Sequence, residues 1–140
     1  MIDLYISKPE EAAEYNAFGE PELPESECMK PDEEISATEL SMLWAILEDR
    51  EPRASDADAF ERAHEADDGE EIILRIPAAI VAGLSRLDEP SIAVAAERWL
   101  RTNEVLWVCT STAKKVLSNL ACLARSAQAT GKSLYLYFHA

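Results

Sequence analysis

Hydrophobic and polar positions alternate at the start of the chain and again near its end. Ile2, Leu4 and Ile6 occupy every second position of one segment, and residues 134–138 repeat the pattern. A period of two predicts a strand with one buried face, because successive side chains of a strand point to opposite sides. The second segment follows Gly131, where a preceding helix can end. We therefore expect the two terminal strands to share one sheet.

Four segments between these strands carry apolar residues at helical spacing. The first follows a capping box at residues 36–39, the second begins at Pro77, the third begins at the break formed by residues 88–90, and the last ends at Gly131. Capping boxes and first-turn prolines are typical of helix starts, and glycine is typical of helix ends. The residues available to cap the last helix are Thr110, Ser111 and Thr112.

Weaker patterns predict the remaining elements. Ser7 and the proline two positions later predict a short helix ending near Gly19, and Ser55 predicts a peripheral helix through about Ala66. Residues 72–76 are apolar and β-branched, which favours a strand. Residues 105–109 fit either a buried strand or the entry to the last helix, and periodicity does not separate the two.

These elements predict an α+β fold. We expect one compact domain, residues 1–140, with about five or six helices packed on a small sheet that includes both terminal strands. An acidic, proline-containing loop is expected at about residues 20–35. Hydrophobic residues make up 48% of the chain, which supports a well-formed core.

Composition points to a reducing compartment. The three cysteines are odd in number and far apart, which favours free thiols over disulfides or a zinc site. Residues 1–5 lack the basic start of a signal peptide, and no stretch approaches the roughly 20 apolar residues that span a bilayer. We expect a cytoplasmic protein without a membrane anchor.

Charge is distributed unevenly along the chain. The formal net charge is −14, from 27 acidic and 13 basic side chains. Residues 1–71 hold 23 of the acidic and 5 of the basic ones, and no acidic residue follows Glu104. Because the acidic half repels phosphate, we expect no binding to nucleic acid. A basic protein surface is the partner that this charge favours.

The candidate contact residues lie in three places. The loop contributes Glu22, Glu25 and Glu27, and Tyr135 and Tyr137 form a possible aromatic surface on the outer face of the last strand. A neighbouring helix covering these two tyrosines is the alternative. Segment 56–71 contributes Asp56, Asp58, Glu61, Asp67 and Asp68.

The acidic segment 56–71 and His64 also contain candidate metal ligands, since carboxylates and imidazole bind divalent cations. The spacing does not match a calcium loop. Alignment on Gly69 puts Ala66 where an oxygen ligand is needed and Glu71 where an apolar residue is needed. His64 also lacks the second histidine of a zinc-protease motif. We expect no metal site and no cofactor.

Cys122 is the candidate for a reactive thiol. On the last helix it falls away from the apolar stripe and near Ser118 and Arg125, and a cationic neighbour lowers the pKa of a thiol. The chain contains no serine-hydrolase, phosphate-loop or dinucleotide-binding motif. The sequence leaves enzymatic activity open without favouring it.

Three segments carry a resemblance to a known family: the tryptophan-containing helix 40–47, residues 76–88, and residues 123–136. In these packing patterns the chain is similar to the YfbM-like family of small bacterial domains of unknown function. That family has a histidine within the tryptophan-containing helix, where this chain has Ala45 and Ile46. The resemblance implies an α+β fold and a bacterial origin, and it implies no particular activity.

Two functional hypotheses follow. The first is a non-enzymatic acidic protein-binding module that meets a basic partner, for example an immunity or antitoxin-like protein that neutralises a cationic toxin. The alternative is a small metal-dependent enzyme that uses the acidic cluster 56–71 with His64. A charge that serves only solubility is a third possibility, and the sequence leaves the oligomeric state open.

Overall fold

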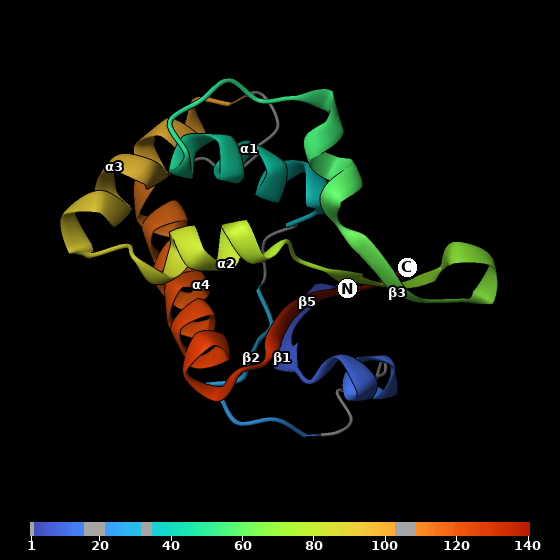
Figure 1. Ribbon diagram of the computed structural model, residues 1–140. Coiled ribbons are helices and arrows are strands. Elements are labelled where there is room, and N and C mark those ends of the chain that lie inside the picture. The colour runs from blue at the N-terminus through green and yellow to red at the C-terminus, as the bar shows by residue number, and fades with distance from the viewer. Residues whose placement is uncertain (1, 16–21, 32–34, 103–108) are drawn as a thin grey trace.

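Five antiparallel strands form one sheet in the order β2-β1-β5-β4-β3 (Figure 1). A computed structural model of the chain describes residues 2–15, 22–31, 35–102 and 109–140. The strands are β1 (Ile2–Ser7), β2 (Cys28–Met29), β3 (Glu61–Ala66), β4 (Glu71–Arg75) and β5 (Ser133–His139). The two terminal strands are neighbours, with Leu4 opposite Leu136 and Ile6 opposite Leu134. The predicted α+β fold and the shared terminal sheet are therefore confirmed.

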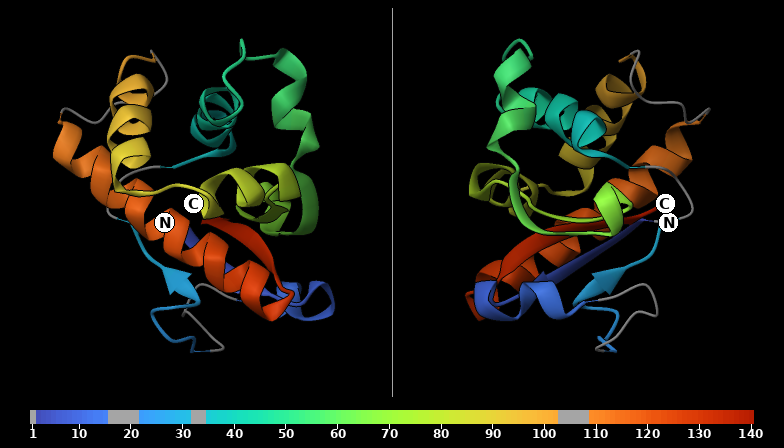
Figure 2. Two further views of the ribbon diagram at one scale, coloured as in Figure 1. Left: turned by 60° about the vertical axis from the view of Figure 1, so that its left-hand side comes forward. Right: turned by 90° about the vertical axis from the view of Figure 1, so that its right-hand side faces the viewer.

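The sheet has two different faces, and other elements pack on each of them (Figure 2). Leu4, Leu136 and their neighbours point toward the α-helices, and we call this side the helix face. Tyr5, Tyr135 and Tyr137 point the other way, toward the 3₁₀-helix η1 (Pro9–Glu14), and we call this side the tyrosine face. The alternation of side chains along β1 and β5 produces this division.

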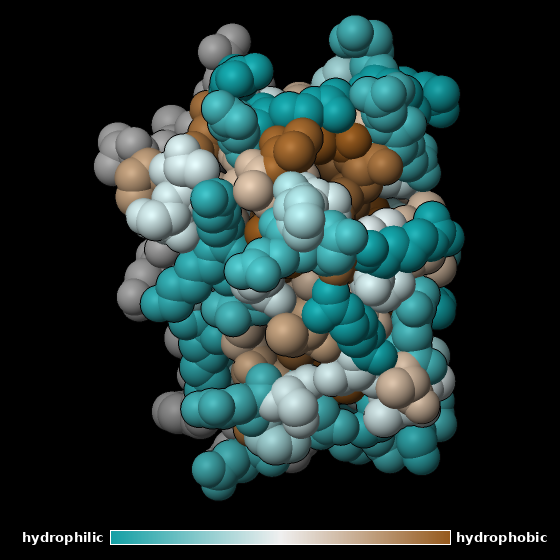
Figure 3. Space-filling view, turned by 90° about the vertical axis from the view of Figure 1, so that its left-hand side faces the viewer, coloured by the Kyte–Doolittle hydropathy of each residue, from teal (hydrophilic) through white to brown (hydrophobic). Residues whose placement is uncertain are grey.

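Four α-helices lie on the helix face in the described residues: α1 (Ala37–Leu47), α2 (Ala78–Ser85), α3 (Glu89–Leu100) and α4 (Thr110–Thr130). From the side of α3, most of the surface is hydrophilic, with an apolar area in its upper half (Figure 3). No helix within the described ranges is both long and apolar enough to cross a membrane.

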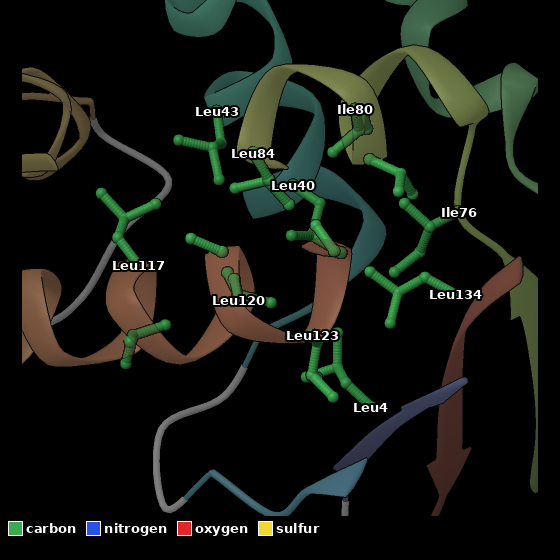
Figure 4. Close-up of a cluster of buried hydrophobic side chains, with 14 of the residues drawn as sticks. Leu4, Leu40, Leu43, Ile76, Ile80, Leu84, Leu117, Leu120, Leu123 and Leu134 are labelled. Carbon is green, nitrogen blue, oxygen red and sulfur yellow. The ribbon is translucent and has the colours of Figure 1, made fainter. Parts of the chain in front are cut away.

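The main core lies between α4, α1, α2 and the helix face (Figure 4). Leu120 and Leu123 of α4 meet Leu4 and Leu134 of the sheet, and all four side chains are 2% exposed or less. Trp99 is also fully buried, and its indole nitrogen donates to the Glu39 carbonyl 3.0 Å away. Burying large apolar side chains in this way is the main source of stability.

The ends of the α-helices follow the predicted capping signals, except at the start of α4. Ser36 and Glu39 form the capping box of α1, Asp88 caps α3, and Gly131 ends α4 in the left-handed conformation at φ 67°. Glycine is favoured there because it has no Cβ to clash. At the start of α4 the capping position is Cys109, not a threonine or serine, so that prediction was wrong.

The predicted helix through Ala66 was also wrong. Residues 54–59 form the 3₁₀-helix η2 (Ala54–Ala59), and the following residues form β3, which pairs with β4 across the 3₁₀ turn η3 (Asp67–Gly69). An edge strand has one neighbour and stays largely exposed, so its charged sequence carries no apolar alternation. The predicted strand over 72–76 is confirmed as β4.

The two remaining weak predictions are corrected in part. The first helix is the 3₁₀-helix η1, which ends at Glu14, and Ser7 donates to the Lys8 carbonyl (2.9 Å) instead of capping it. The loop expected at 20–35 contains β2, which pairs with β1. Gly19 and residues 105–108 lie outside the described residues, so the alternatives for the segment before α4 stay open there.

Candidate interaction surface

Stacked tyrosines fix η1 to the sheet. The rings of Tyr5 and Tyr15 are parallel, with centroids 4.3 Å apart, and Tyr135 stacks on Tyr5 at 5.6 Å. Tyr137 meets the edge of Tyr15 at 5.3 Å. All four rings are 2% exposed or less. Because Tyr15 directly follows η1, this cluster holds the end of the helix against the sheet.

Two hydrogen bonds complete the attachment. The Tyr15 hydroxyl donates to the carboxyl group of Asp3 (2.5 Å), and the Tyr5 hydroxyl donates to the Ala12 carbonyl (2.7 Å). Burial raises the pKa of both tyrosines far above the ordinary value, and for Tyr15 the hydrogen bond to Asp3 adds to the effect. Both hydroxyls therefore remain protonated donors across the physiological pH range.

This attachment directs the acidic side of η1 outward. Ala12 and Tyr15 are buried, whereas Glu10, Glu11 and Glu14 are exposed. The ion pairs formed among the described residues involve other carboxylates and leave these three out. The sequence-based candidates did not include these glutamates, although the capping signal at the start of this segment placed them on a helix.

The strand β3 adds to the same surface. Burial raises the pKa of Tyr135, the Arg75 guanidinium acts against this shift, and the carboxylates of Glu61 and Glu10 act with it. Glu10 of η1 and Glu61 of β3 are therefore within electrostatic reach of one hydroxyl group. Glu61 stays highly exposed, and its contact with Arg75 spans 4.0 Å.

The loop before β2 borders η1 on another side. Glu22 and Glu25 are exposed, and Leu23 between them packs against the tyrosine cluster. Glu27 differs, because it is half-buried and forms an ion pair with Lys132 at 2.9 Å. Glu27 therefore ties the loop to the end of α4. The exposed carboxylates described so far form what we call the acidic face: Glu10, Glu11, Glu14, Glu22, Glu25 and Glu61.

Asp56 is buried and paired within the chain, so it does not present the exposed carboxylate that the prediction of a contact residue assumed. It is 4% exposed, and its two carboxyl oxygens each lie 3.0 Å from Arg50 nitrogens. The Arg53 backbone N–H donates a further hydrogen bond at 2.8 Å. The hydrogen bonds from Arg50 hold the pKa of Asp56 below its usual value. Asp56 thus fixes the loop between α1 and η2.

The rest of the acidic segment is spread over η2, β3 and the turn η3. Asp58 and Asp68 are exposed, Asp68 with a positive φ of 55°, and the side chain of Asp67 lies outside the described residues. His64 lies 3.6 Å from Glu71. Within the described residues, no three His, Cys, Asp or Glu side chains are placed to hold a metal ion together.

Tyr135 and Tyr137 do not form the exposed aromatic surface that was predicted. They are 1% and 0% exposed, beneath η1 and Tyr15. The alternation of the strand correctly separated them from the leucines, and the alternative interpretation, that a neighbouring helix covers them, is the one that η1 bears out. The tyrosines support the acidic face from below.

Two thiols on α4 are exposed. Cys122 has Arg125 one turn away, but this guanidinium donates to the carbonyls of Ser85 and Leu87 at the end of α2. Cys109 lies at the start of the helix, with its Sγ 3.0 Å from the Thr112 hydroxyl. Hydrogen bonds from Ser111 and Thr112 lower the pKa of Cys109 to about 7. The sequence-based search missed Cys109 because the segment before it had no assigned structure.

Comparison with known proteins adds no relative. The chain matches no known protein family, no curated protein and no solved structure. The resemblance to the YfbM-like family therefore stays a prediction, and the function has to be argued from the surface itself.

Proposed function

We propose that the chain is a non-enzymatic protein-binding module whose acidic face meets a basic surface on a partner protein. The observation that carries the proposal is the arrangement of η1. Its Ala12 and the following Tyr15 are buried, while its three glutamates project outward and take part in no ion pair with the described residues. Neutralisation of a cationic toxin, as by an immunity or antitoxin-like protein, is one role of this kind.

The placement of the carboxylates supports binding over a purely solubilising role. Charges on flexible loops raise solubility equally well, whereas here the backbone beneath the glutamates is fixed by the Tyr15–Asp3 hydrogen bond and the tyrosine stack. A surface that is ordered before binding loses less conformational entropy when the complex forms. The acidic face therefore has the property that a specific interface uses.

The start of α4 carries the opposite charge to η1. Lys114 and Lys115 are exposed on the first turns of α4, whereas η1 lies on the other face of the sheet (Figure 1). A basic partner approaching this molecule is attracted toward η1 and repelled from the start of α4. Such polarity orients an encounter and raises the association rate.

Charge removal at η1 tests the proposal. We would capture partners from a lysate of the source cells with the wild-type chain and with the triple variant Glu10→Gln, Glu11→Gln, Glu14→Gln. At about 0.2–1 kcal/mol per exposed carboxylate, we expect affinity for the captured partner to fall about tenfold. The matched control removes the same charge elsewhere, at Glu51, Glu70 and Glu89, which are exposed and take part in no ion pair with the described residues.

The loop provides a second set of variants. Glu22→Gln and Glu25→Gln should weaken the same partner further, whereas Glu27→Gln also breaks the ion pair with Lys132 and is unsuitable as a binding test. A captured partner without a basic surface would contradict the proposal. Equal losses from the η1 variant and the control variant would show that only total charge matters.

A further inference from the structure

A small cavity lies beside η1, bordered by this 3₁₀-helix, the end of β1 and the loop before β2. Its volume is about 70 Å³. One water needs about 10–15 Å³ of such space, so the cavity has room for a group of roughly five non-hydrogen atoms. That matches the end of one long side chain and is too small for a nucleotide or a sugar.

Part of the cavity wall is apolar. Tyr5, Ile6 and Tyr15 contribute buried side chains, and Leu23 of the loop is half-buried beside them. The methylene stem of a lysine or arginine packs well against such a wall, while its charged end stays near the opening.

Most polar groups of the wall are already bonded within the chain. The hydroxyls of Tyr5, Tyr15 and Ser7 each donate a hydrogen bond to another residue. The only cation in the wall, among the described residues, is Lys132, and it forms an ion pair with Glu27 at 2.9 Å. These groups are therefore satisfied without a ligand.

Two carboxylates of the wall differ. Glu11 and Glu14 are three residues apart, and a 3₁₀-helix has three residues per turn, so they lie on the same side of η1. Both line the cavity and are exposed, and neither carboxylate forms a hydrogen bond or ion pair with another described residue. Two neighbouring carboxylates repel each other, and a cation placed between them removes the repulsion.

We propose that this cavity receives an arginine side chain of the basic partner. The guanidinium group donates hydrogen bonds to Glu11 and Glu14, and the methylene stem packs against Leu23. Arginine suits the site better than lysine, because its five N–H donors lie in one plane and reach two carboxylates at once. This inference rests on the proposed function, because it takes the partner to be basic, and it names the anchor of that contact. Arginine is enriched among the residues that dominate binding energy at protein interfaces.

Other occupants fit less well. A metal ion would find two carboxylates here, and within the described ranges no three candidate ligands come together. A second copy of the chain carries a formal net charge of −14 and is repelled. Lys132 fills the cavity only by leaving Glu27, and the test below includes this case.

The test uses two blocked tripeptides, glycine–arginine–glycine and its neutral analogue with citrulline in place of arginine. Each is titrated at low ionic strength into the ¹⁵N-labelled protein and followed by NMR. We expect the arginine peptide to shift the amide signals of residues 5–7 and 11–15 saturably, and the citrulline peptide to leave them in place. The double variant Glu11→Gln, Glu14→Gln should weaken binding about fivefold. The control Glu51→Gln, Glu89→Gln removes the same charge elsewhere and should leave the affinity unchanged.

The outcomes separate this inference from the proposed function. Equal shifts with the two peptides, or equal losses from single glutamine variants at positions 10, 11 and 14, would overturn the cavity. The acidic module would still stand if the triple variant of η1 loses the captured partner. A partner captured equally well by the wild type and the triple variant would count against both. An arginine peptide that binds only after Lys132→Gln would assign the cavity to Lys132 and overturn the inference.

Discussion

Replacement of Tyr15 by phenylalanine removes a single hydroxyl group, and we expect it to lower the free energy of unfolding substantially. The variant keeps the ring that stacks on Tyr5 at 4.3 Å and removes only the hydroxyl that donates to Asp3. Asp3 is 2% exposed, so water cannot readily replace the lost donor. A hydrogen bond to a charged group contributes about 1.5–3 kcal/mol, and we expect the free energy of unfolding to fall by about 2 kcal/mol.

Tyr5→Phe is the matched control. It also removes one buried hydroxyl, but the acceptor there is the neutral carbonyl of Ala12. A neutral hydrogen bond contributes about 1 kcal/mol, so this variant should lose about half as much stability. Both losses are measured by urea unfolding, where the midpoint should shift while the slope stays constant.

A double variant identifies the cause. If the loss comes from a buried carboxyl group without its donor, adding Asp3→Asn to Tyr15→Phe should restore part of the stability, because a neutral amide is less costly to bury. Tyr15→Phe losing no more stability than Tyr5→Phe would refute the reasoning. A double variant that loses more stability than the two single variants together would also refute it.

Three further predictions concern other parts of the fold. Asp56→Asn should lower the free energy of unfolding by about 2 kcal/mol at neutral pH. Because the folded-state pKa of Asp56 is lowered, the stabilisation by its carboxylate should be full above about pH 4 and disappear as the pH falls through the folded-state pKa. The unfolding curves of the variant and the wild type should therefore converge in acid. Gly131→Ala should cost about 1 kcal/mol in thermal unfolding through its positive φ alone, since no atom lies within 4 Å of an added Cβ; a neutral substitution would contradict this. In a Cys122→Ser variant, the rate of iodoacetamide alkylation of Cys109 should reach half its maximum near pH 7. A midpoint at the ordinary thiol pKa of about 8.5 would show that the hydrogen bonds from Ser111 and Thr112 do not stabilise the thiolate.

The parts of the fold with strong periodicity could be predicted from the sequence. The alternation at Ile2, Leu4 and Ile6 predicted a terminal strand, and the serine and glutamate of the α1 capping box marked the start of that helix within one residue. These signals are local, because they depend on backbone geometry and on side chains three or four residues apart. They hold in almost any tertiary setting.

The acidic face depended on contacts between distant segments, and so it was only partly predicted. The loop glutamates Glu22 and Glu25 were found, because a run of exposed charge is visible in the sequence. The central glutamates of η1 were missed, since their importance depends on Tyr15 reaching Asp3 across the sheet. Asp56 was misassigned for the same reason, because its partner Arg50 lies in a different predicted element.

The association rate of the captured partner tests the central claim most directly. It is measured by stopped-flow fluorescence over a range of ionic strength, with the wild-type chain and with the variant carrying glutamine at positions 10, 11 and 14. We predict a rate that falls steeply with salt for the wild type, and a slower, flatter dependence for the variant. Identical rates for the two proteins at low salt would contradict an acidic face that guides the partner.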